Sequence, residues 1–122
     1  MASGPRASRP YMPGYGIVGT DTGRGLLPWS WAEQRLVAAR NYWIATTRPD
    51  GRPHCRPVWG VWLADGFWFS TGSLARHNLA ANPQITLHLE SGDQVVILEG
   101  VAAAYRREID RLRRVLAGPV RA

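Results

Sequence analysis

Short apolar segments alternate with turn signals through the middle of the chain, and this spacing restricts the fold more than any other feature. The turn-forming sequences are Pro-Asp-Gly-Arg at 49–52, Ala-Asp-Gly at 64–66 and Ser-Gly-Asp at 91–93. The expected strands around them span residues 42–48, 53–63, 67–71, 84–90 and 95–98. Most of these segments are rich in the aromatic and β-branched residues that favour strands. Because most follow one another without a crossover helix, we predict a mainly β, α+β fold whose antiparallel sheet closes into a barrel.

Two of the expected strands carry information about burial. In residues 84–90 the apolar side chains of Ile85, Leu87 and Leu89 alternate with polar ones, which is typical of a strand with one buried face. Residues 95–98 are apolar at every position. This second pattern predicts a central strand that is covered on both faces.

Three segments have the signals of helices. Ser30 and Glu33 form a capping-box pattern, in which each side chain bonds a free backbone N–H, so a helix is expected over residues 31–40. A short helix is expected over residues 74–81, where Ser73 can cap the start and an Asn-Pro pair follows the end. The third expected helix is marked by an apolar stripe of Tyr105, Ile109, Leu112 and Leu116.

Glycine and proline interrupt residues 1–28 at ten positions, which is too many breakers for a long regular element. We therefore expect a flexible, Gly/Pro-rich arm over residues 1–28. Residues 29–122 are expected to form the single folded domain that a chain of 122 residues allows.

Charge and cysteine content narrow the classes of function. The net charge is +6. Residues 106–122 hold six arginines against two acids, so most of the excess positive charge lies in the tail. This positive charge does not by itself indicate nucleic-acid binding. No apolar run is long enough to cross a membrane, and no signal peptide is recognisable. The single cysteine, Cys55, provides no disulfide framework or cysteine-based zinc site, which points to the cytoplasm. The three histidines lack the spacing of metal ligands, so no metal is expected.

Seven short motifs follow one another through the expected strands and the short helix. They are Tyr-Trp-Ile-Ala-Thr at 42–46, Asp-Gly-Arg-Pro-His at 50–54, Pro-Val-Trp-Gly at 57–60, Phe-Ser-Thr-Gly at 69–72, Asn-Leu-Ala-Ala-Asn-Pro at 78–83, His-Leu-Glu-Ser-Gly-Asp at 88–93 and Val-Val-Ile-Leu-Glu-Gly at 95–100. In this order, over residues 29–104, they resemble the pyridoxamine 5'-phosphate oxidase-like family. The branch that uses the deazaflavin coenzyme F-420 is the most similar, and the FMN-using branch is next.

The resemblance implies an antiparallel split β-barrel with short flanking helices, built as a homodimer that holds the cofactor at the subunit interface. It also implies that residues 29–122 form the cofactor-binding domain and that the family's C-terminal strands are missing from this chain. The cofactor expected from the resemblance is coenzyme F-420 or FMN.

A hydroxyl-rich turn before the short helix is the candidate phosphate site. Ser70, Thr71 and Ser73 precede a helix N-terminus, whose free N–H groups and positive dipole end suit an anion, and Arg76 can add a charge-assisted contact. The resemblance implies the same four positions. The alternative is that these hydroxyls only end a strand and cap a helix, and that Arg76 is a solvated surface arginine.

The resemblance also places Arg56, Val58 and Trp59 beside the ring system or the phosphate of the cofactor. Arg56 lies in an otherwise apolar segment and therefore needs a partner, which is either the phosphate or one of the carboxylates of Glu90 and Glu99.

Other singled-out residues have simpler interpretations. Cys55 is expected to be a small core residue. His54 is a possible general acid, although a structural histidine is the simpler interpretation. Trp29 and Trp31 are expected to anchor the first helix. The remaining tryptophans, Trp43, Trp59, Trp62 and Trp68, are expected to fill the core and a dimer interface, with Trp59 packing on the cofactor ring.

Two functions follow from this reading. The first is a flavin- or deazaflavin-dependent oxidoreductase that acts on an unidentified small molecule, with no catalytic acid or base assigned. The second is a non-catalytic protein that binds or carries a flavin, a deazaflavin or haem. A nucleic-acid or acidic-partner role for the arginine-rich tail ranks below both.

Overall fold

The computed structural model describes residues 7–8, 11–17, 26–63 and 66–104. Much of the expected arm over 1–28 and the expected helix beyond residue 104 lie outside these ranges. The elements in chain order are η1 (Pro13–Tyr15), α1 (Trp29–Ala38), β1 (Tyr42–Thr47), β2 (Pro53–Val58), β3 (Gly60–Leu63), β4 (Gly66–Phe69), α2 (Leu74–Ala81), β5 (Gln84–His88) and β6 (Ile97–Val101). Among the described helices, none combines the length and the apolar character that a membrane span needs.

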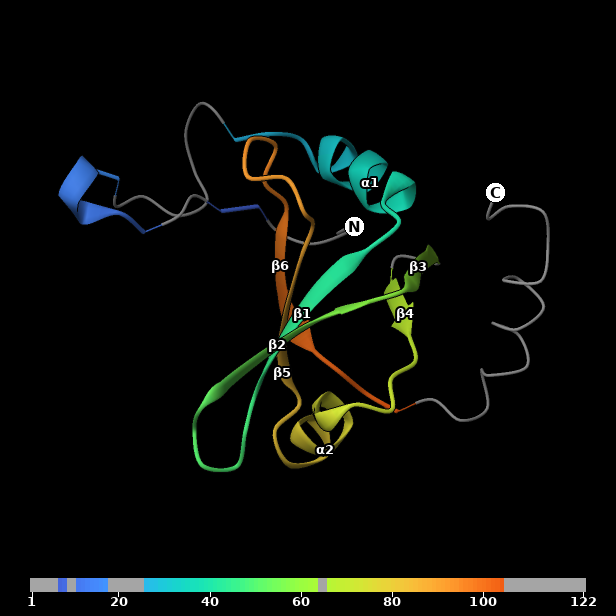
Figure 1. The fold of residues 1–122 in the computed structure, drawn as a ribbon. Coiled ribbons are helices and arrows are strands. Elements are labelled where there is room, and N and C mark those ends of the chain that lie inside the picture. The colour runs from blue at the N-terminus through green and yellow to red at the C-terminus, as the bar shows by residue number, and fades with distance from the viewer. Residues whose placement is uncertain (1–6, 9–10, 18–25, 64–65, 105–122) are drawn as a thin grey trace.

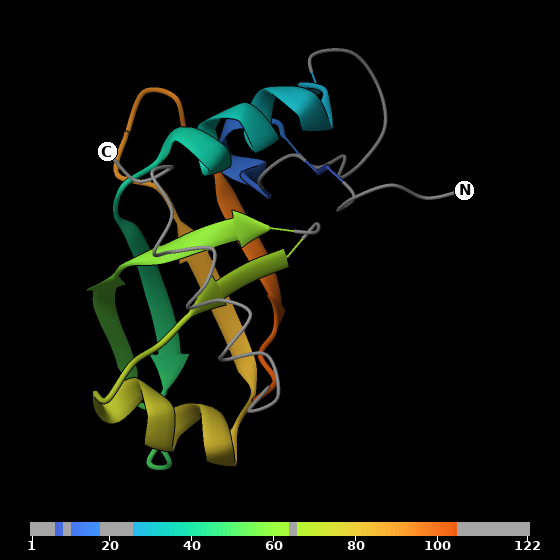
Figure 2. The ribbon, with the colours of Figure 1, turned by 90° about the vertical axis from the view of Figure 1, so that its right-hand side faces the viewer.

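All strand pairs in the described ranges are antiparallel and form two sheets. Four strands pair in the order β2-β1-β5-β6, and β3 pairs with β4 in a separate hairpin. This hairpin crosses one face of the four-stranded sheet, with α1 near one end of the strands and α2 near the other (Figures 1 and 2). The predicted antiparallel, mainly β fold with short helices is thus confirmed, and the two sheets stay separate rather than closing.

The core lies between the four-stranded sheet, the crossing hairpin and the two helices. It is formed by the buried side chains of Leu36, Tyr42, Ile44, Val58, Ala75, Leu87, Leu89 and Val96. Strand β1 alternates strictly between buried and half-buried positions, as a strand with one face on a core must. The Tyr42 hydroxyl donates a 2.6 Å hydrogen bond to the Leu36 carbonyl and so ties β1 to the end of α1.

The prediction of one strand over residues 53–63 is wrong, because the chain changes sheets inside that segment. β2 ends at Val58 and β3 begins at Gly60, with the 77% exposed Trp59 between them. A Cβ atom on Gly60 would overlap the Phe67 ring and lie 2.7 Å from the carbonyl oxygen of Trp68. The close approach of β3 to β4 therefore requires glycine at this position.

The capping box predicted for the first helix is also wrong. The helix begins at Trp29, its N-cap residue is Pro28, and Ser30 lies within its first turn. Glu33 instead accepts a 3.1 Å hydrogen bond from the Trp62 indole, while the Trp29 and Trp62 rings pack 5.6 Å apart. Contacts with β3 thus replace the local capping that the sequence favoured.

Two burial predictions fail for reasons of strand position. Residues 95–98 do not form a covered central strand: the regular strand β6 begins at Ile97, lies at the sheet edge among the described strands, and leaves Ile97 58% exposed. Cys55 is exposed and not a core residue. It pairs across the strands with Ala45, so both side chains point away from the face that holds the buried Ile44.

Candidate functional site

The segment that joins β4 to α2 is ordered by its own hydroxyl groups. Ser73 caps α2 as predicted, because its hydroxyl oxygen accepts a 3.2 Å hydrogen bond from the Ala75 N–H. The Thr71 hydroxyl oxygen accepts a 3.1 Å bond from the Ser73 N–H, and the two hydroxyl oxygens lie 2.8 Å apart. The hydroxyls of Thr71 and Ser73 therefore form one hydrogen-bonded pair at the helix start.

Part of the backbone at this helix start is available to a ligand. The amides of Ser73 and Ala75 bond to the hydroxyls, and the Arg76 amide donates to the Ser73 carbonyl at 3.0 Å. The amides of Gly72 and Leu74 form no hydrogen bond with any other described residue. They lie on either side of Ser73, where the positive end of the helix dipole favours an anion.

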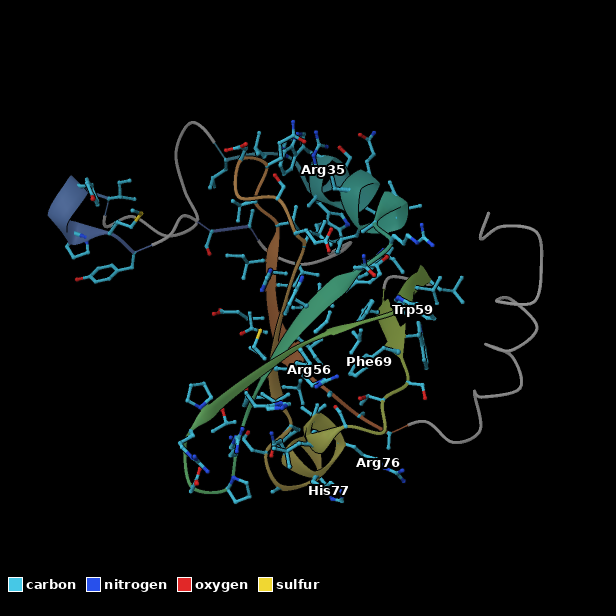
Figure 3. All side chains as sticks on the ribbon, in the orientation of Figure 1. Arg35, Arg56, Trp59, Phe69, Arg76 and His77 are labelled. Carbon is cyan, nitrogen blue, oxygen red and sulfur yellow. The ribbon has the colours of Figure 1, made fainter. Side chains whose placement is uncertain are left out.

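Two arginines lie on the side of the four-stranded sheet that faces this segment. Arg76 is on α2 and Arg56 is on β2, and Figure 3 shows both on the same side of the sheet as Phe69 and the β3–β4 hairpin. Both are exposed, and neither forms an ion pair with another described residue. The alternative that Glu90 or Glu99 neutralises Arg56 is therefore wrong.

The other predicted site residues are Ser70, Val58 and Trp59. Ser70 is exposed and follows β4, whereas Val58 is buried in the core at the end of β2. Trp59 leaves most of its indole in solvent where β2 gives way to β3. The predicted residues thus lie on two stretches of chain: the end of β2 with Trp59, and the segment from the end of β4 into the first turn of α2.

Sequence reasoning missed two side chains on the elements that carry these residues. Phe69, at the end of β4, stacks on Phe67 with ring centroids 5.4 Å apart. Asn78 is completely buried and donates a 3.0 Å hydrogen bond to the Thr46 hydroxyl, which fastens α2 to β1. Asn78 follows the polar residues Arg76 and His77 on α2, so no local pattern in the sequence marks it as buried.

No group of three or more histidine, cysteine or acidic side chains gathers in the part of the chain that the structure describes. His54 is half-buried on β2, and His77 is exposed on α2. His88 packs parallel to the Trp43 ring, with the centroids 6.2 Å apart.

Comparison with known proteins agrees with this fold and defines the class as a split barrel. Residues 32–120 match the pyridoxamine 5'-phosphate oxidase family. Because this match includes most of the chain, the protein belongs to that family. No similar protein was found among curated sequences.

Solved structures of other proteins also resemble the fold of this chain. A conserved hypothetical protein from Mycobacterium tuberculosis has a TM-score of 0.62 and 26% identity over 70% of this chain. An F420 reductase has a TM-score of 0.50 and 25% identity over 58%. A FAD-binding protein from Mesorhizobium loti has a TM-score of 0.59 over 75% of this chain and 70% of its own, and at 20% identity it shows the fold alone. The chain spans 59% and 61% of the length of the first two proteins.

Proposed function

We propose that this protein is an oxidoreductase that binds the phosphate of coenzyme F-420 or FMN at the start of α2. The observation that carries the proposal combines two arginines with two backbone amides at the hydroxyl-capped helix start. Arg56 and Arg76 form no ion pair, and the Gly72 and Leu74 amides form no hydrogen bond, with any other described residue. A phosphate group accepts hydrogen bonds from all of these donors. The similarity to an F420 reductase supports a cofactor of this class.

Each residue has a distinct part in this proposal. The hydroxyls of Thr71 and Ser73 and the amides beside them hold phosphate oxygens, with Ser70 extending the polar segment. Arg56 and Arg76 balance the phosphate charge. Trp59 offers a flat, exposed indole on which the tricyclic ring lies, and the buried Val58 fixes the strand end from which Trp59 projects.

The bound cofactor supplies hydride or electron transfer, which no side chain of the protein can perform. The residues of the chain bind the phosphate, orient the ring and shield one ring face from water. The other ring face remains for a small organic substrate.

We further propose a homodimer with the cofactor at the subunit interface. The 77% exposed Trp59, at the end of β2 beside the site, supports this arrangement, because burial of a large aromatic side chain at an interface is favourable. Sedimentation analysis with and without FMN tests it, and a monomer in both conditions contradicts it. The proposed compartment is the cytoplasm, since Cys55 is a free thiol.

Titration of the full chain with FMN and with coenzyme F-420, followed by fluorescence, tests the cofactor proposal. Arg76→Gln removes one charge-assisted hydrogen bond, worth about 1.5–3 kcal/mol, so it should weaken binding roughly 10- to 150-fold. The matched control is Arg40→Gln, because Arg40 is an exposed arginine that follows α1. The proposal is contradicted if neither FMN nor coenzyme F-420 binds. It is also contradicted if Arg76→Gln and Arg40→Gln weaken binding equally.

A turnover assay separates the enzyme from the carrier. The protein is loaded with reduced cofactor and mixed with a panel of quinones and activated alkenes. Oxidation faster than that of free cofactor supports the oxidoreductase. Tight binding that slows oxidation by every member of the panel assigns the protein to a storage or carrier role.

A further inference from the structure

The outer face of β6, which is turned away from the core, is open to solvent. Leu98 packs against the core, so the side chains of Ile97, Glu99 and Val101 project from the opposite face of this strand. Ile97 is 58% exposed and Val101 is 66% exposed. Figures 1 and 2 show the β3–β4 hairpin on the other side of the four-stranded sheet. The described residues therefore leave two large apolar side chains on this face uncovered.

The surface of rings and aliphatic groups continues across the sheet from Ile97. This residue lies opposite His88 on β5, and His88 lies opposite Trp43 on β1. The last residue in the row is the exposed Pro57 on β2, which lies opposite Trp43. Directly opposite side chains point to the same face of a sheet, and the rings of Trp43 and His88 lie parallel with their centroids 6.2 Å apart. A row without carboxylates or guanidinium groups thus crosses the whole sheet on this face.

The charge on this face is negative. Among the strand residues of the sheet that project from it, only Glu99 has a carboxylate or a guanidinium group. The Glu99 carboxylate forms neither an ion pair nor a hydrogen bond with another described residue. A second copy of the same face, or a nucleic acid, would bring further negative charge against it. A segment whose apolar side chains are bordered by arginines complements the face in both respects.

Residues 105–122, which lie outside the described ranges, have this composition. They hold six arginines against two acids, and their sequence predicts a helix with one apolar stripe. At about 3.6 residues per turn, Arg106 and Arg113 lie about two turns apart and border this stripe on the same side. Arg114 falls on the opposite side of the helix from the stripe. The two bordering arginines are therefore placed to pair with a carboxylate that lies beside an apolar surface, as Glu99 does.

The chain leaves the sheet at a point from which such a helix can return along β6. The Ala102 N–H donates a 2.8 Å hydrogen bond to the Pro83 carbonyl, which fixes the end of the strand. Residues 102–104 give a connection of ordinary length between a strand and a helix. A helix over residues 105–116 would be roughly 18 Å long, and β6 is roughly 17 Å long. An antiparallel helix would thus place its apolar stripe along the whole strand.

We propose that residues 105–122 dock on the outer face of β6 of the same chain as an amphipathic helix. The apolar stripe of the helix packs on the exposed apolar side chains of β6, and Arg106 and Arg113 flank the carboxylate of Glu99. The arginines on the far side of the helix remain in solvent. Because Arg56 projects from the opposite face of the sheet, which holds the core, this docking does not depend on the proposed function.

Disulfide formation within the full chain tests the position of this segment. In a Cys55→Ser background, Ile97→Cys is combined with Leu112→Cys, which lies on the expected stripe. The matched control combines Leu112→Cys with Gly100→Cys, because Gly100 is exposed and belongs to the other face of the same strand. Under mild oxidation we expect the Ile97 pair to form an intrachain disulfide about tenfold or more faster than the control pair, in which the tether alone brings the two thiols together.

Charge variants of the chain with Ile97→Cys and Leu112→Cys test the ion pair. Arg113→Glu places a carboxylate beside Glu99, so it should slow disulfide formation about threefold or more. Arg114→Glu makes the same change on the far side of the helix and should leave the rate within about twofold. Adding Glu99→Arg to Arg113→Glu restores opposite charges and should make the disulfide form faster than with Arg113→Glu alone.

A second cysteine pair, Val101→Cys with Ile109→Cys, replaces the first pair if Ile97→Cys fails to fold. The proposal is overturned if the test pair and the control pair form disulfides at equal rates, or if the disulfide joins two chains. Equal effects of Arg113→Glu and Arg114→Glu also overturn it.

Discussion

The hydrogen bond between Asn78 and Thr46 is the one polar link buried between α2 and the four-stranded sheet within the described residues, and its removal gives a test with a definite sign. Asn78 is fully buried and Thr46 is 4% exposed. Thr46→Val keeps the side-chain shape but leaves the Asn78 amide N–H without its 3.0 Å partner. Oδ1 of Asn78 has no hydrogen-bond partner among the described residues, so both polar ends of this amide would then be buried without a partner there. We expect a loss of about 1–3 kcal/mol in the free energy of unfolding.

The double variant Thr46→Val, Asn78→Leu should be more stable than Thr46→Val alone. Leucine has the branched four-atom frame of asparagine with bulkier methyl groups, and it removes both polar atoms. Replacing both partners of a buried hydrogen bond by apolar groups of similar shape is nearly neutral. The sum of the two single effects should therefore exceed the effect of the double variant by about 1 kcal/mol or more.

Urea unfolding followed by tryptophan fluorescence measures these free energies, and equal m-values confirm that the variants unfold in the same way. The matched control is Thr86→Val on β5, because Thr86 forms no side-chain hydrogen bond with a described residue; its effect should stay within about 0.5 kcal/mol. The reasoning fails if the effect of the double variant equals the sum of the two single effects to within about 0.5 kcal/mol. The hydrogen bond would then not fasten α2 to β1.

The remaining predictions concern the sheet crossing and the phosphate segment. Gly60→Ala should lower the free energy of unfolding, measured in urea, by about 1–3 kcal/mol, because the new Cβ would overlap the Phe67 ring. The control Gly100→Ala should have little effect, because the space around Gly100 is open. Equal losses for the two variants would contradict the close approach of β3 to β4. Ser73→Ala should remove the cap of α2 and about 1 kcal/mol of stability in the same assay. Ser73→Asp should keep the cap yet place a carboxylate at the proposed phosphate site, so FMN binding should weaken while the urea midpoint is retained; unchanged FMN binding would argue against that site.

Local signals explain which elements could be predicted from the sequence. The bounds of α2 match the expectation over residues 74–81 because both the Ser73 cap and the Asn-Pro end act within a few residues. The turn after β1 also depends on neighbouring residues alone. Gly51 adopts φ +90°, and the Asp50 carboxylate accepts a hydrogen bond from the Arg52 N–H. The hydroxyl pair of Thr71 and Ser73 could be predicted for the same reason.

Features that depend on distant parts of the chain could not be predicted. The break at Trp59 follows from the crossing of a second sheet, and the exposure of Ile97 follows from the position of β6 at an edge. Cys55 is short and apolar enough for a core. Side chains on β2 alternate between the two faces of the sheet, however, and Cys55 occupies a position that points away from the buried face. The link between Asn78 and Thr46 joins residues 32 positions apart, and no spacing pattern marks it.

The position of Arg56 connects the open form of the two sheets to the proposed function. Arg56 pairs across the strands with the buried Ile44, so both side chains start from the same face of the sheet. Arg56 nevertheless reaches solvent because β2 is an edge strand of the four-stranded sheet. No described residue forms an ion pair with Arg56, and under the proposed function a cofactor phosphate would supply the missing counter-charge.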